Sequence, residues 1–553
     1  MPELRREPDF SARALASGLA VGGLLCVANL YMGLKTGIWD SGHVTASVLA
    51  FALASGRLTR LENNIAQTAA TAAGAVPAAA GLLGAVPALE MLGRAVPGWG
   101  IALWGLALAV IGILFGAALR QRLLEEEKLP FPTGVATAEV IEALQADRAA
   151  ASGRTRPLMW GGVVGAVLGW FRDGKPALIP GAVAIPGSVG GVPLATLGIG
   201  VSVSPLLWGV GMVVGLRIAL SMLLGSVLGW GVLAPWLVSG PLHVAATRGA
   251  IWNWLSWPGT ALLVGAALVA LVQQAGAFAG ALRDLRSAAG DRSRWRIQGA
   301  VLGLAAGAAT ILLGKLVFDL HPLYTALALL VSILGASVCA RAAGLTDLSP
   351  LGPVGQVTQA IYGGLAPGQP SVNIAAGSVV AGDATHAPIL LWSLGAGRSL
   401  GASPRSQIVA ALVGSVLGAI VCAPAYVLLV RAFTLGSPRL PAPTGIQWKA
   451  MGEVVAQGLS ALPPGALPAV AAAAVIGVIL AALGSVRWLP SAMAMGIGIL
   501  VPVDYSMAFV LGALLVRAVP ALRERGPVAG AGLIAGDSLV GIAVALLMSF
   551  ALL

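Results

Sequence analysis

The sequence predicts an all-α, polytopic integral membrane protein, and three observations support that prediction. First, 58% of its 553 residues are hydrophobic and only 10% are charged, whereas a soluble domain is roughly 45–50% apolar and about 25% charged. Second, apolar runs recur along the whole chain, and a bilayer-spanning helix needs about 20 such residues. Third, the longest polar stretch, near Arg283–Arg296, is no larger than a loop, so we expect no separate soluble domain.

The apolar runs define the expected helices, and several runs are long enough for two. They are Ala12–Leu34, Val76–Leu119, Leu206–Leu237, Ala261–Leu282, Ile297–Val317, Leu323–Ala340, Ile408–Val430, Ala466–Ala482 and Val528–Leu553. With double spans and shorter broken segments included, we expect about 14 to 18 transmembrane elements. Residues 1–553 are therefore predicted to form a single transmembrane domain.

The basic residues predict the orientation and location of the chain. The start, MPELRREPDFSAR, leads into a long apolar run without a small-residue cleavage site, which favours a retained first helix over a signal peptide. The net charge of +11 is better explained by cytoplasmic loops facing anionic lipids than by nucleic-acid binding. We therefore expect an inner-membrane protein with membrane lipids as partners, no nucleic-acid partner and a cytoplasmic N-terminus. The side of the C-terminus stays open, and a homo-oligomer is compatible with the sequence.

Motifs of soluble enzymes and metal sites are missing from the sequence. The three cysteines, Cys26, Cys339 and Cys422, are scattered within apolar runs, which argues against a disulfide framework or a cysteine metal site. The four histidines are widely separated, and neither HExxH nor GxSxG occurs. GDSL at Gly536–Leu539 looks like a hydrolase signature, but it starts the last hydrophobic helix with no histidine nearby. We expect a protein that is not an enzyme and has neither a cofactor nor a metal site.

Short motifs in the two halves of the chain match at a nearly constant offset. GLKTG from Gly33 matches GLTD from Gly344, NIA from Asn64 matches NIA from Asn373, and PTGVATAEVIEAL from Pro132 matches PTGIQWKAMGEVV from Pro443. We predict two copies of one multi-helix unit, about residues 12–240 and 322–553, with about two linking helices within 252–318. Internal repeats are typical of secondary transporters, whose substrate site lies near the midplane at the repeat interface.

Leu61–Gly74, LENNIAQTAATAAG, is unusually polar for its surroundings. On a helix, Asn64, Gln67, Thr68 and Thr71 share one face because they are spaced i, i+3, i+4 and i+7. We call this face the amide stripe. Such a stripe cannot face lipid cheaply, so it faces either a neighbouring helix, through interhelical hydrogen bonds, or a watered cavity. A second small-residue pattern, Gly414 and Gly418, has the spacing of a close helix contact.

Glycine-interrupted or proline-interrupted polar segments accompany the stripe in both halves, and they favour the cavity. One contains Asn29, Tyr31, Lys35, Asp40 and His43, and the other leads from Gln359 to Asn373, Asp383 and His386. They predict broken or re-entrant helices near the midplane, whose free N–H and C=O groups can bind substrate. The predicted substrate-binding residues are Asn29, Tyr31, Lys35, Asn64, Gln67, Thr68, Gln359, Asn373 and Asp383.

Ionisable residues at membrane depth are the candidates for proton coupling. Asp383 and His386 are three residues apart and so lie on one helical face, with a loop or helix-cap role as the alternative. Glu139, after FPTGVATAEV, and Glu453, in the matching segment, are the next candidates. For Lys35 the alternatives are an ion pair with Asp40 and contact with a substrate carboxylate.

Taken in order, nine motifs resemble those of the oligopeptide transporter (OPT) family. They are GLKTG, ENNIAQTAATAAG, LPFPTGVATAE, SPLLWGVGMVVGLRIALSMLLGSVLGWGVLAP, WNWLSWPGTALL, GLTDLSPLGPVGQVTQ, GASPRSQ, LPSAMAMGIGILVP and AGLIAGDSLVG. The resemblance runs from about Gly18 to the end. It implies about 16 transmembrane helices and uptake driven by the proton gradient. Its implied substrates are short peptides in one branch and nicotianamine or siderophore metal chelates in the yellow stripe-like branch.

Departures from the family pattern favour the prokaryotic and yellow stripe-like side. The peptide branch's Asn-Pro-Gly and Lys-Ile-Pro-Pro-Arg motifs are missing, and GDATHAP places His386 near an expected lysine. We predict a proton-coupled symporter that imports short oligopeptides or peptide-like metal chelates, with any metal arriving already chelated. The alternatives are a polytopic membrane enzyme acting on a lipid or isoprenoid, and a passive channel.

Overall fold

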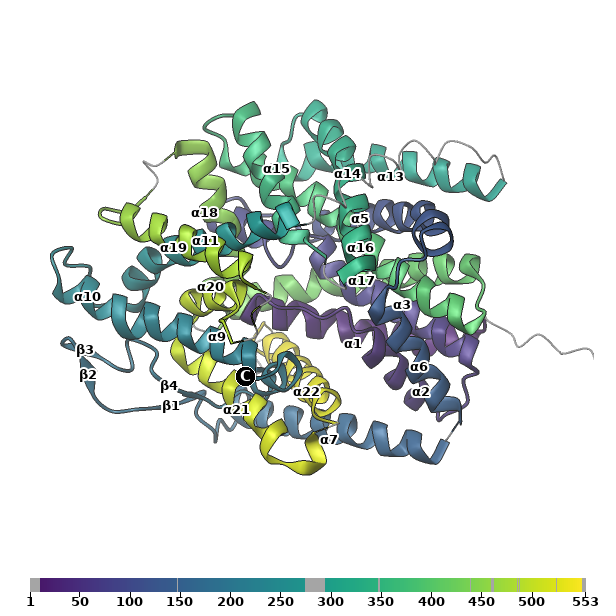
Figure 1. Cartoon of the computed structure of the whole chain (residues 1–553), viewed down its shortest axis with the longest axis horizontal. Helices are drawn as coiled ribbons and strands as arrows, with labels where there is room; N and C mark the ends of the chain where they lie inside the picture. Colours follow the sequence, from purple (N-terminus) through teal and green to yellow (C-terminus); the bar gives the residue numbers. More distant parts are fainter. Residues whose placement is uncertain are drawn as a thin grey trace, which may run out of the picture.

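The computed structural model describes residues 10–146, 148–273, 294–346, 349–437, 439–458, 462–484, 486, 488–523 and 525–549. Arg5, Arg6 and most of the basic segment 283–296 lie outside them. Helices dominate the described part of the chain (Figure 1). Seven helical stretches there are long and apolar enough to cross a membrane: Ala12–Thr36, Gly98–Glu126, Leu216–Ser239, Ile297–Phe318, Pro322–Gly344, Pro370–Leu400 and Pro404–Ala432. The prediction of an all-α, multi-pass membrane protein is confirmed, while the figure of about 16 helices stays a prediction.

The first half of the chain contains the following helices. They are α1 (Ala12–Thr36), α2 (His43–Leu53), α3 (Arg60–Ala79), α4 (Ala85–Met91), α5 (Gly98–Arg120) with the π-helix η1 (Gln121–Glu126), α6 (Pro132–Ala146), α7 (Arg148–Asp173), α8 (Pro205–Val214), α9 (Leu216–Ser226) with the π-helix η2 (Val227–Leu233), α10 (Ala234–Ser239) and α11 (Arg248–Gln273). The predicted double span Val76–Leu119 thus holds the end of α3, the short α4 and most of α5.

The rest of the chain contains the following helices. They are α13 (Arg294–Phe318), α14 (Pro322–Thr346), α15 (Leu351–Leu365), α16 (Pro370–Leu400), α17 (Pro404–Ala432), α18 (Pro443–Gln457), α19 (Leu467–Ala482), α20 (Ala492–Leu500), α21 (Val503–Ala518), the 3-10 turn η4 (Pro520–Leu522) and α22 (Gly526–Ser549).

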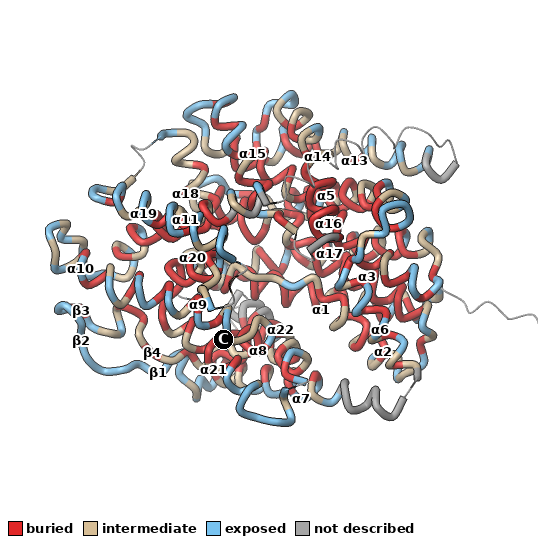
Figure 2. Tube along the Cα trace, viewed as in Figure 1, coloured by how far each residue is buried: buried red, intermediate tan, exposed pale blue. Residues whose placement is uncertain are grey.

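Two short antiparallel strand pairs, which the all-α prediction did not include, lie between α7 and α8. β1 (Ala182–Ala184) pairs with β4 (Gly200–Ser202), and β2 (Ser188–Val189) pairs with β3 (Val192–Pro193). β1 and β2 are exposed at one edge of the molecule (Figure 2). Val192 of β3 joins a buried apolar cluster, and Ser202 of β4 is buried too, whereas the bundle formed by the long helices remains all helical.

Helix α3, which carries the amide stripe, begins with a capping box. The backbone N–H of Glu62 donates to Oγ1 of Thr59 (3.1 Å), and the backbone N–H of Thr59 donates to the Glu62 carboxylate (2.9 Å). This arrangement satisfies two N–H groups that a helix start leaves free. Every residue from Glu62 to Pro77 is buried, as expected for a helix at the centre of a bundle.

Two apolar stretches are split into shorter helices. Gly215, with a φ of 81°, separates α8 from α9, and a positive φ favours glycine. Pro502, which has no N–H to donate, stands between α20 and α21. The split helices pack crosswise, α8 on α21 and α9 on α20. Helix interruptions are therefore present, while their depth in the membrane stays a prediction.

Long helices from both halves of the chain form the core. α1 packs on α3, and α14 packs on α16. α3 also packs on α17, α16 also packs on α5, and α3 and α16 contact each other. Figure 2 shows the buried residues concentrated along these helices.

Small residues bring α3 and α17 close together, as the spacing of Gly414 and Gly418 predicts. A Cβ on Gly414 would lie 2.1 Å from the carbonyl oxygen of Ala69, and one on Gly418 would lie 2.6 Å from that of Ala73. Both backbones are rigid parts of helices, so moving either one away would cost packing energy.

A charged cluster around Glu127, directly after the span Gly98–Glu126, joins η1 to α14. Arg341 of α14 donates two hydrogen bonds to the Glu127 carboxylate, at 2.5 and 2.9 Å, and Arg122 donates a third at 2.9 Å. The hydrogen bonds from Arg341, followed by that from Arg122, lower the pKa of Glu127 to about 2.

We expect Gly414→Ala to destabilise the protein, because the added methyl group would overlap the Ala69 backbone. Overpacking of this kind costs about 1–3 kcal/mol. Thermal unfolding of the protein in detergent would measure the change. Gly364→Ala is the matched control, since nothing lies within 4 Å of a Cβ there and alanine favours a helix. An unchanged midpoint for Gly414→Ala would contradict the close contact.

The stability contributed by Glu127 should depend on pH in acid. A carboxylate whose pKa is lowered on folding contributes fully above its unfolded value of about 4.5, and loses that contribution as pH falls toward about 2. The thermal midpoint of Glu127→Gln should therefore lie below that of the native protein at pH 7, and the gap should shrink below about pH 4.5. A gap that is the same at pH 7 and pH 3 would argue against this pair.

Candidate functional site

A cavity of about 570 Å³ opens among the helices, within the size range of small-molecule sites. Its walls come from the loop after α1, the turn between α3 and α4, and helices α15, α16, α18 and α20. The site is therefore built from segments far apart in the sequence. We call it the main cavity.

The described lining of the main cavity combines aliphatic, aromatic and uncharged polar side chains. The indoles of Trp39, Trp392 and Trp448 line it. Amide and hydroxyl groups add hydrogen-bonding capacity from Gln356, Gln447, Ser41, Ser349, Ser378, Thr133, Thr385 and Thr444. Among the described lining residues, Asp40 is the one with an ionisable side chain. Such a lining suits a polar molecule of small size.

The predicted residue Asn29 fixes the loop that carries Asp40. Its Nδ2 donates to the carbonyl oxygens of Asp40 (2.8 Å) and Gly74 (2.9 Å), and its Oδ1 accepts from the backbone N–H of Asp40 (3.2 Å). The loop starts and ends at glycines with positive φ, Gly37 at 74° and Gly42 at 68°. Asn29 therefore holds a cavity wall against α3 rather than lining the cavity itself.

Gln359 and Asn373, also predicted to bind substrate, hold α18 in place. Gln359 donates to the carbonyl oxygen of Trp448 (3.1 Å), and Asn373 donates to that of Gly452 (3.1 Å). Both residues are fully buried. They position the helix that carries Trp448 into the main cavity.

The amide stripe of α3 lies among packed helices. Gln67 donates to Oγ of Ser393 on α16 (3.0 Å), Thr68 donates to the backbone oxygen of Asn64 (2.7 Å), and the Asn64 amide has no hydrogen-bond partner in the described part of the chain. None of the nine predicted substrate-binding residues is among the described residues that line the main cavity. The Gln67 contact is of the interhelical kind considered as the alternative.

Asp383 and His386 lie side by side in the middle of α16, so the loop or helix-cap alternative does not apply. Both are fully buried. The Asp383 carboxylate has the Ser332 hydroxyl of α14 as a neighbour, and Nε2 of His386 lies 3.0 Å from the Ala72 carbonyl oxygen of α3. Another face of the same helix, with Ala381, Thr385, Pro388 and Trp392, lines the main cavity.

The other two candidates for proton coupling lie at the surface. Glu139 is exposed on α6. Glu453 is partly exposed on α18, 3.7 Å from the ammonium group of Lys449. The structure does not bring them together with Asp383 and His386.

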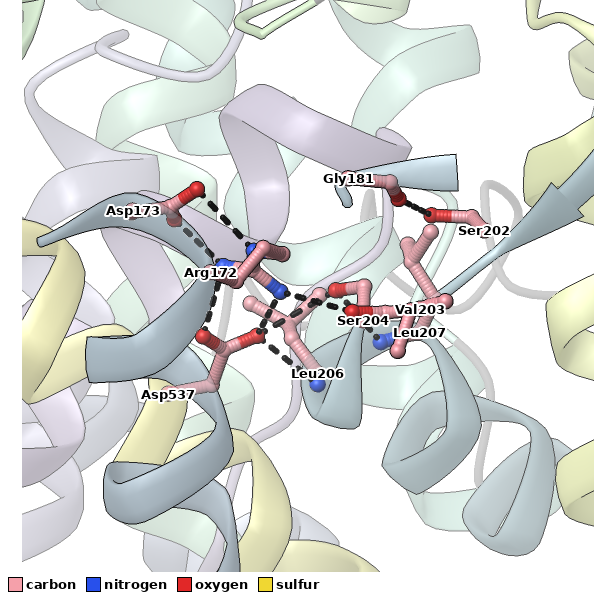
Figure 3. Close-up of polar contacts among 9 residues, drawn as sticks. All are labelled: Arg172, Asp173, Gly181, Ser202, Val203, Ser204, Leu206, Leu207 and Asp537. Carbon is pink, nitrogen blue, oxygen red and sulfur yellow. Dashed lines mark hydrogen bonds and ion pairs between the residues drawn. The ribbon is translucent and has the colours of Figure 1, made fainter. Parts of the chain in front are cut away.

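A buried charge cluster, which the sequence-based interpretation missed, ties α7, α8 and α22 together (Figure 3). Arg172 donates to both carboxylate oxygens of Asp537, at 2.8 and 3.1 Å, and also pairs with Asp173. The Asp537 carboxylate also accepts from the backbone N–H of Leu206 (2.9 Å) and from the hydroxyl of Ser204 (3.2 Å). The GDSL motif therefore supplies the anchor for the start of α8. Two charged residues at the end of an apolar run, Arg172 and Asp173, were the available signal.

Tyr31 and Lys35 belong to the α22 side of α1. The Lys35 ammonium group lies 4.6 Å from the centre of the Tyr31 ring. A Cβ on Gly541 of α22 would lie 2.7 Å from that ring. Lys35 makes no ion pair with Asp40 within the part of the chain that the structure describes.

The described residues include no group of three or more His, Cys, Asp or Glu side chains that could hold a metal. Cys26, Cys339 and Cys422 are separate buried thiols.

A ligand-sized cavity inside a bundle of apolar helices is typical of multi-pass membrane proteins that handle small molecules. The family model described as OPT oligopeptide transporter protein matches residues 9–548. The chain therefore belongs to the OPT family, which confirms the resemblance seen in its motifs.

Full-length relatives agree with this assignment. Two proteins named "Putative oligopeptide transporter", YGL114W of Saccharomyces cerevisiae and one of Haemophilus influenzae, are 24% and 26% identical to this chain. The alignments cover 91% and 94% of this chain, and 90% and 92% of the relatives. The iron-phytosiderophore transporter yellow stripe 1 of Zea mays is 23% identical, over 96% of this chain and 89% of its own length. The protein is accordingly a transport protein rather than an enzyme.

Removing one partner of the Arg172–Asp537 pair should destabilise the fold strongly. Asp537→Ala would remove two hydrogen bonds from the buried Arg172 guanidinium, which keeps Asp173, and would leave the first turn of α8 without its acceptor. Breaking a buried pair costs up to about 3–5 kcal/mol. Thermal unfolding in detergent measures the loss. Asp319→Ala removes an exposed carboxylate paired with Lys315 and should leave the midpoint unchanged. Equal midpoints for the two variants would refute an anchoring role.

Proposed function

We propose that the protein is a proton-coupled symporter that imports short oligopeptides or peptide-like metal chelates across the cytoplasmic membrane. The observation that carries this proposal is the main cavity, with three indoles, many uncharged polar groups and a carboxylate in a volume of about 570 Å³. The names of the relatives support both substrate classes, since they include oligopeptide transporters and iron-phytosiderophore transporters.

We infer that the bundle consists of two repeats and that the cavity lies at their interface. In support, α1, α3 and α5 of the first half correspond by position to α14, α16 and α17 of the second half. The pair α1 and α3 packs together, as does the pair α14 and α16, and α3 contacts α17 as α16 contacts α5. These pairs are related by the offset between the matching motifs. A site between repeats suits alternating access, in which one repeat moves against the other. The N-terminus is proposed to face the cytoplasm.

The coupling proton is proposed to bind at Asp383, with His386 as its neighbour. The Asp383 carboxylate is fully buried in the middle of α16, and another face of that helix lines the main cavity. An ionisable group at membrane depth is expected to be functional. Protonation would lower the cost of closing the bundle around it, so that proton and substrate cross together. Glu139 and Glu453 gain no such support, because their surface positions let water solvate the charge.

The proposal is tested by uptake into proteoliposomes. Labelled tri-alanine and an iron–nicotianamine chelate are supplied separately, each with and without an inward proton gradient. Accumulation of either one only with the gradient is expected. Equilibration without accumulation would instead indicate a passive channel, and no uptake of either by folded protein would overturn the proposal.

Asp383→Asn should abolish accumulation while it keeps the cavity intact. The carboxamide has nearly the same shape but cannot bind the coupling proton, so uptake should fall to the level seen without a gradient. Glu139→Gln is the comparison, and it should accumulate substrate normally. If Glu139→Gln loses accumulation and Asp383→Asn keeps it, the coupling role belongs to Glu139.

A further inference from the structure

The main cavity carries one carboxylate, that of Asp40, and no cationic side chain among its described lining residues, which indicates the part of a substrate that it recognises. We propose that the cavity binds its substrate through a protonated amino group, held by the Asp40 carboxylate, with the indole of Trp39 and the amide of Gln356 in the same lining. This inference rests on the proposed function, because it names the substrate class of the same site: short peptides with a free N-terminus.

The Asp40 carboxylate is presented to the cavity by a fixed backbone. Its peptide unit exchanges hydrogen bonds with both ends of the Asn29 carboxamide, which is itself bonded to Gly74 of α3. The residue is exposed, and the backbone N–H groups of Ser41 and Gly42 donate to its carboxylate. A charged group held in this way needs no rearrangement to meet a ligand, which lowers the entropic cost of binding.

No cation of the described chain neutralises Asp40. The described lining of the cavity has no Lys, Arg or His, and Asp40 makes no ion pair. Lys35, the nearest lysine in the sequence, lies over the Tyr31 ring instead. A positively charged ligand group would therefore complete the electrostatics of the cavity, whereas a second anion would be repelled.

The aromatic lining suits an ammonium group. A cation near an indole face gains about 0.5–2 kcal/mol, more as water is excluded. Trp448 is seated firmly, because a Cβ on Gly84, Gly355 or Gly377 would come within 2.9, 2.7 or 3.1 Å of its ring. The Trp448 ring therefore occupies space that is free only because these three positions are glycine, and this close packing restricts its movement.

Gln356 supplies the second observation that points to a ligand. It is 4% exposed and lines the cavity. Neither its carboxamide oxygen nor its nitrogen has a hydrogen-bond partner in the described chain, although buried polar groups are normally bonded. A carboxamide offers one acceptor and two donors, which match the N–H and C=O of a peptide bond. Gln359, one turn later, is by contrast bonded to the Trp448 carbonyl oxygen.

Together these groups discriminate between ligands. A peptide with a free amino terminus offers an ammonium group to Asp40 and an amide to Gln356. An N-acetylated peptide keeps the amide but loses the charge. A chelate whose amines are all bound to metal likewise lacks an ammonium group, so the cavity favours free peptides over such chelates.

The test is titration calorimetry of the full-length protein in detergent, with tri-alanine and N-acetyl-tri-alanine as probes. The native protein should bind tri-alanine about 10- to 100-fold more tightly than its acetylated form, the usual range for a hydrogen bond to a charged group. Asp40→Asn should weaken tri-alanine binding by a similar factor and leave the acetylated peptide unaffected. Asp319→Asn, on an exposed carboxylate far along the chain, should bind both probes as the native protein does.

Several results would overturn the inference. They are equal binding of the two peptides by the native protein, undiminished binding of tri-alanine by Asp40→Asn, and no binding of either peptide at millimolar concentration. The comparison of the two peptides uses the native protein alone, so it tests the inference even if Asp40→Asn fails to fold. Uptake separates this inference from the proposed function. Equal gradient-driven accumulation of both peptides would support the symporter function and refute the role of Asp40 in recognising the amino group. Binding that depends on Asp40 but occurs without accumulation would support that role and refute the symporter function.

Discussion

The cost of burying polar groups among apolar helices is the constraint on which the rest of this structure depends. An unbonded backbone or side-chain group inside a bilayer costs several kcal/mol, so each helix break needs a partner nearby. Buried side-chain amides need partners as well: Asn29, Gln359 and Asn373 each donate to a backbone carbonyl inside a neighbouring helix. The walls of the main cavity are therefore held by amides that stand behind them.

Charge is handled in two different ways. Asp537 is fully buried and is surrounded by Arg172, a hydroxyl and a backbone N–H, which together replace water. Asp40 keeps its charge facing an open cavity. The first arrangement is suited to fixing helices to one another, because breaking it leaves an isolated charge. The second is suited to binding, because its energy is realised only when a ligand of opposite charge arrives.

Close packing of helix backbones also stabilises the bundle. Glycines at helix crossings let α3 and α17 approach within a methyl group's width, as Gly414 against Ala69 shows. Apolar side chains gain little from helix association in lipid, so such contacts carry much of the packing energy. This explains why a chain rich in glycine forms long, well-packed helices rather than loops.

The sequence by itself determined the class of the protein and several local features. Hydropathy identified the apolar helices, because the bilayer sets both their composition and their length. The order of motifs identified the family, and spacing identified the Gly414 contact. Polar residues inside apolar runs were recognised as important, since burial of such residues is always costly.

Only the tertiary structure showed which polar residues line the main cavity and which ones bond to the backbone of a neighbouring helix. Asn29, Gln359 and Asn373 resemble ligand-binding residues in sequence, yet they bond to backbone, whereas Asp40 and Gln356, close to them along the chain, line the cavity. Periodicity gives the face of a helix but not its neighbour, because the neighbour depends on the packing of distant helices. Arg172 and Asp537 illustrate the same limit, since 365 positions separate two side chains that form one ion pair.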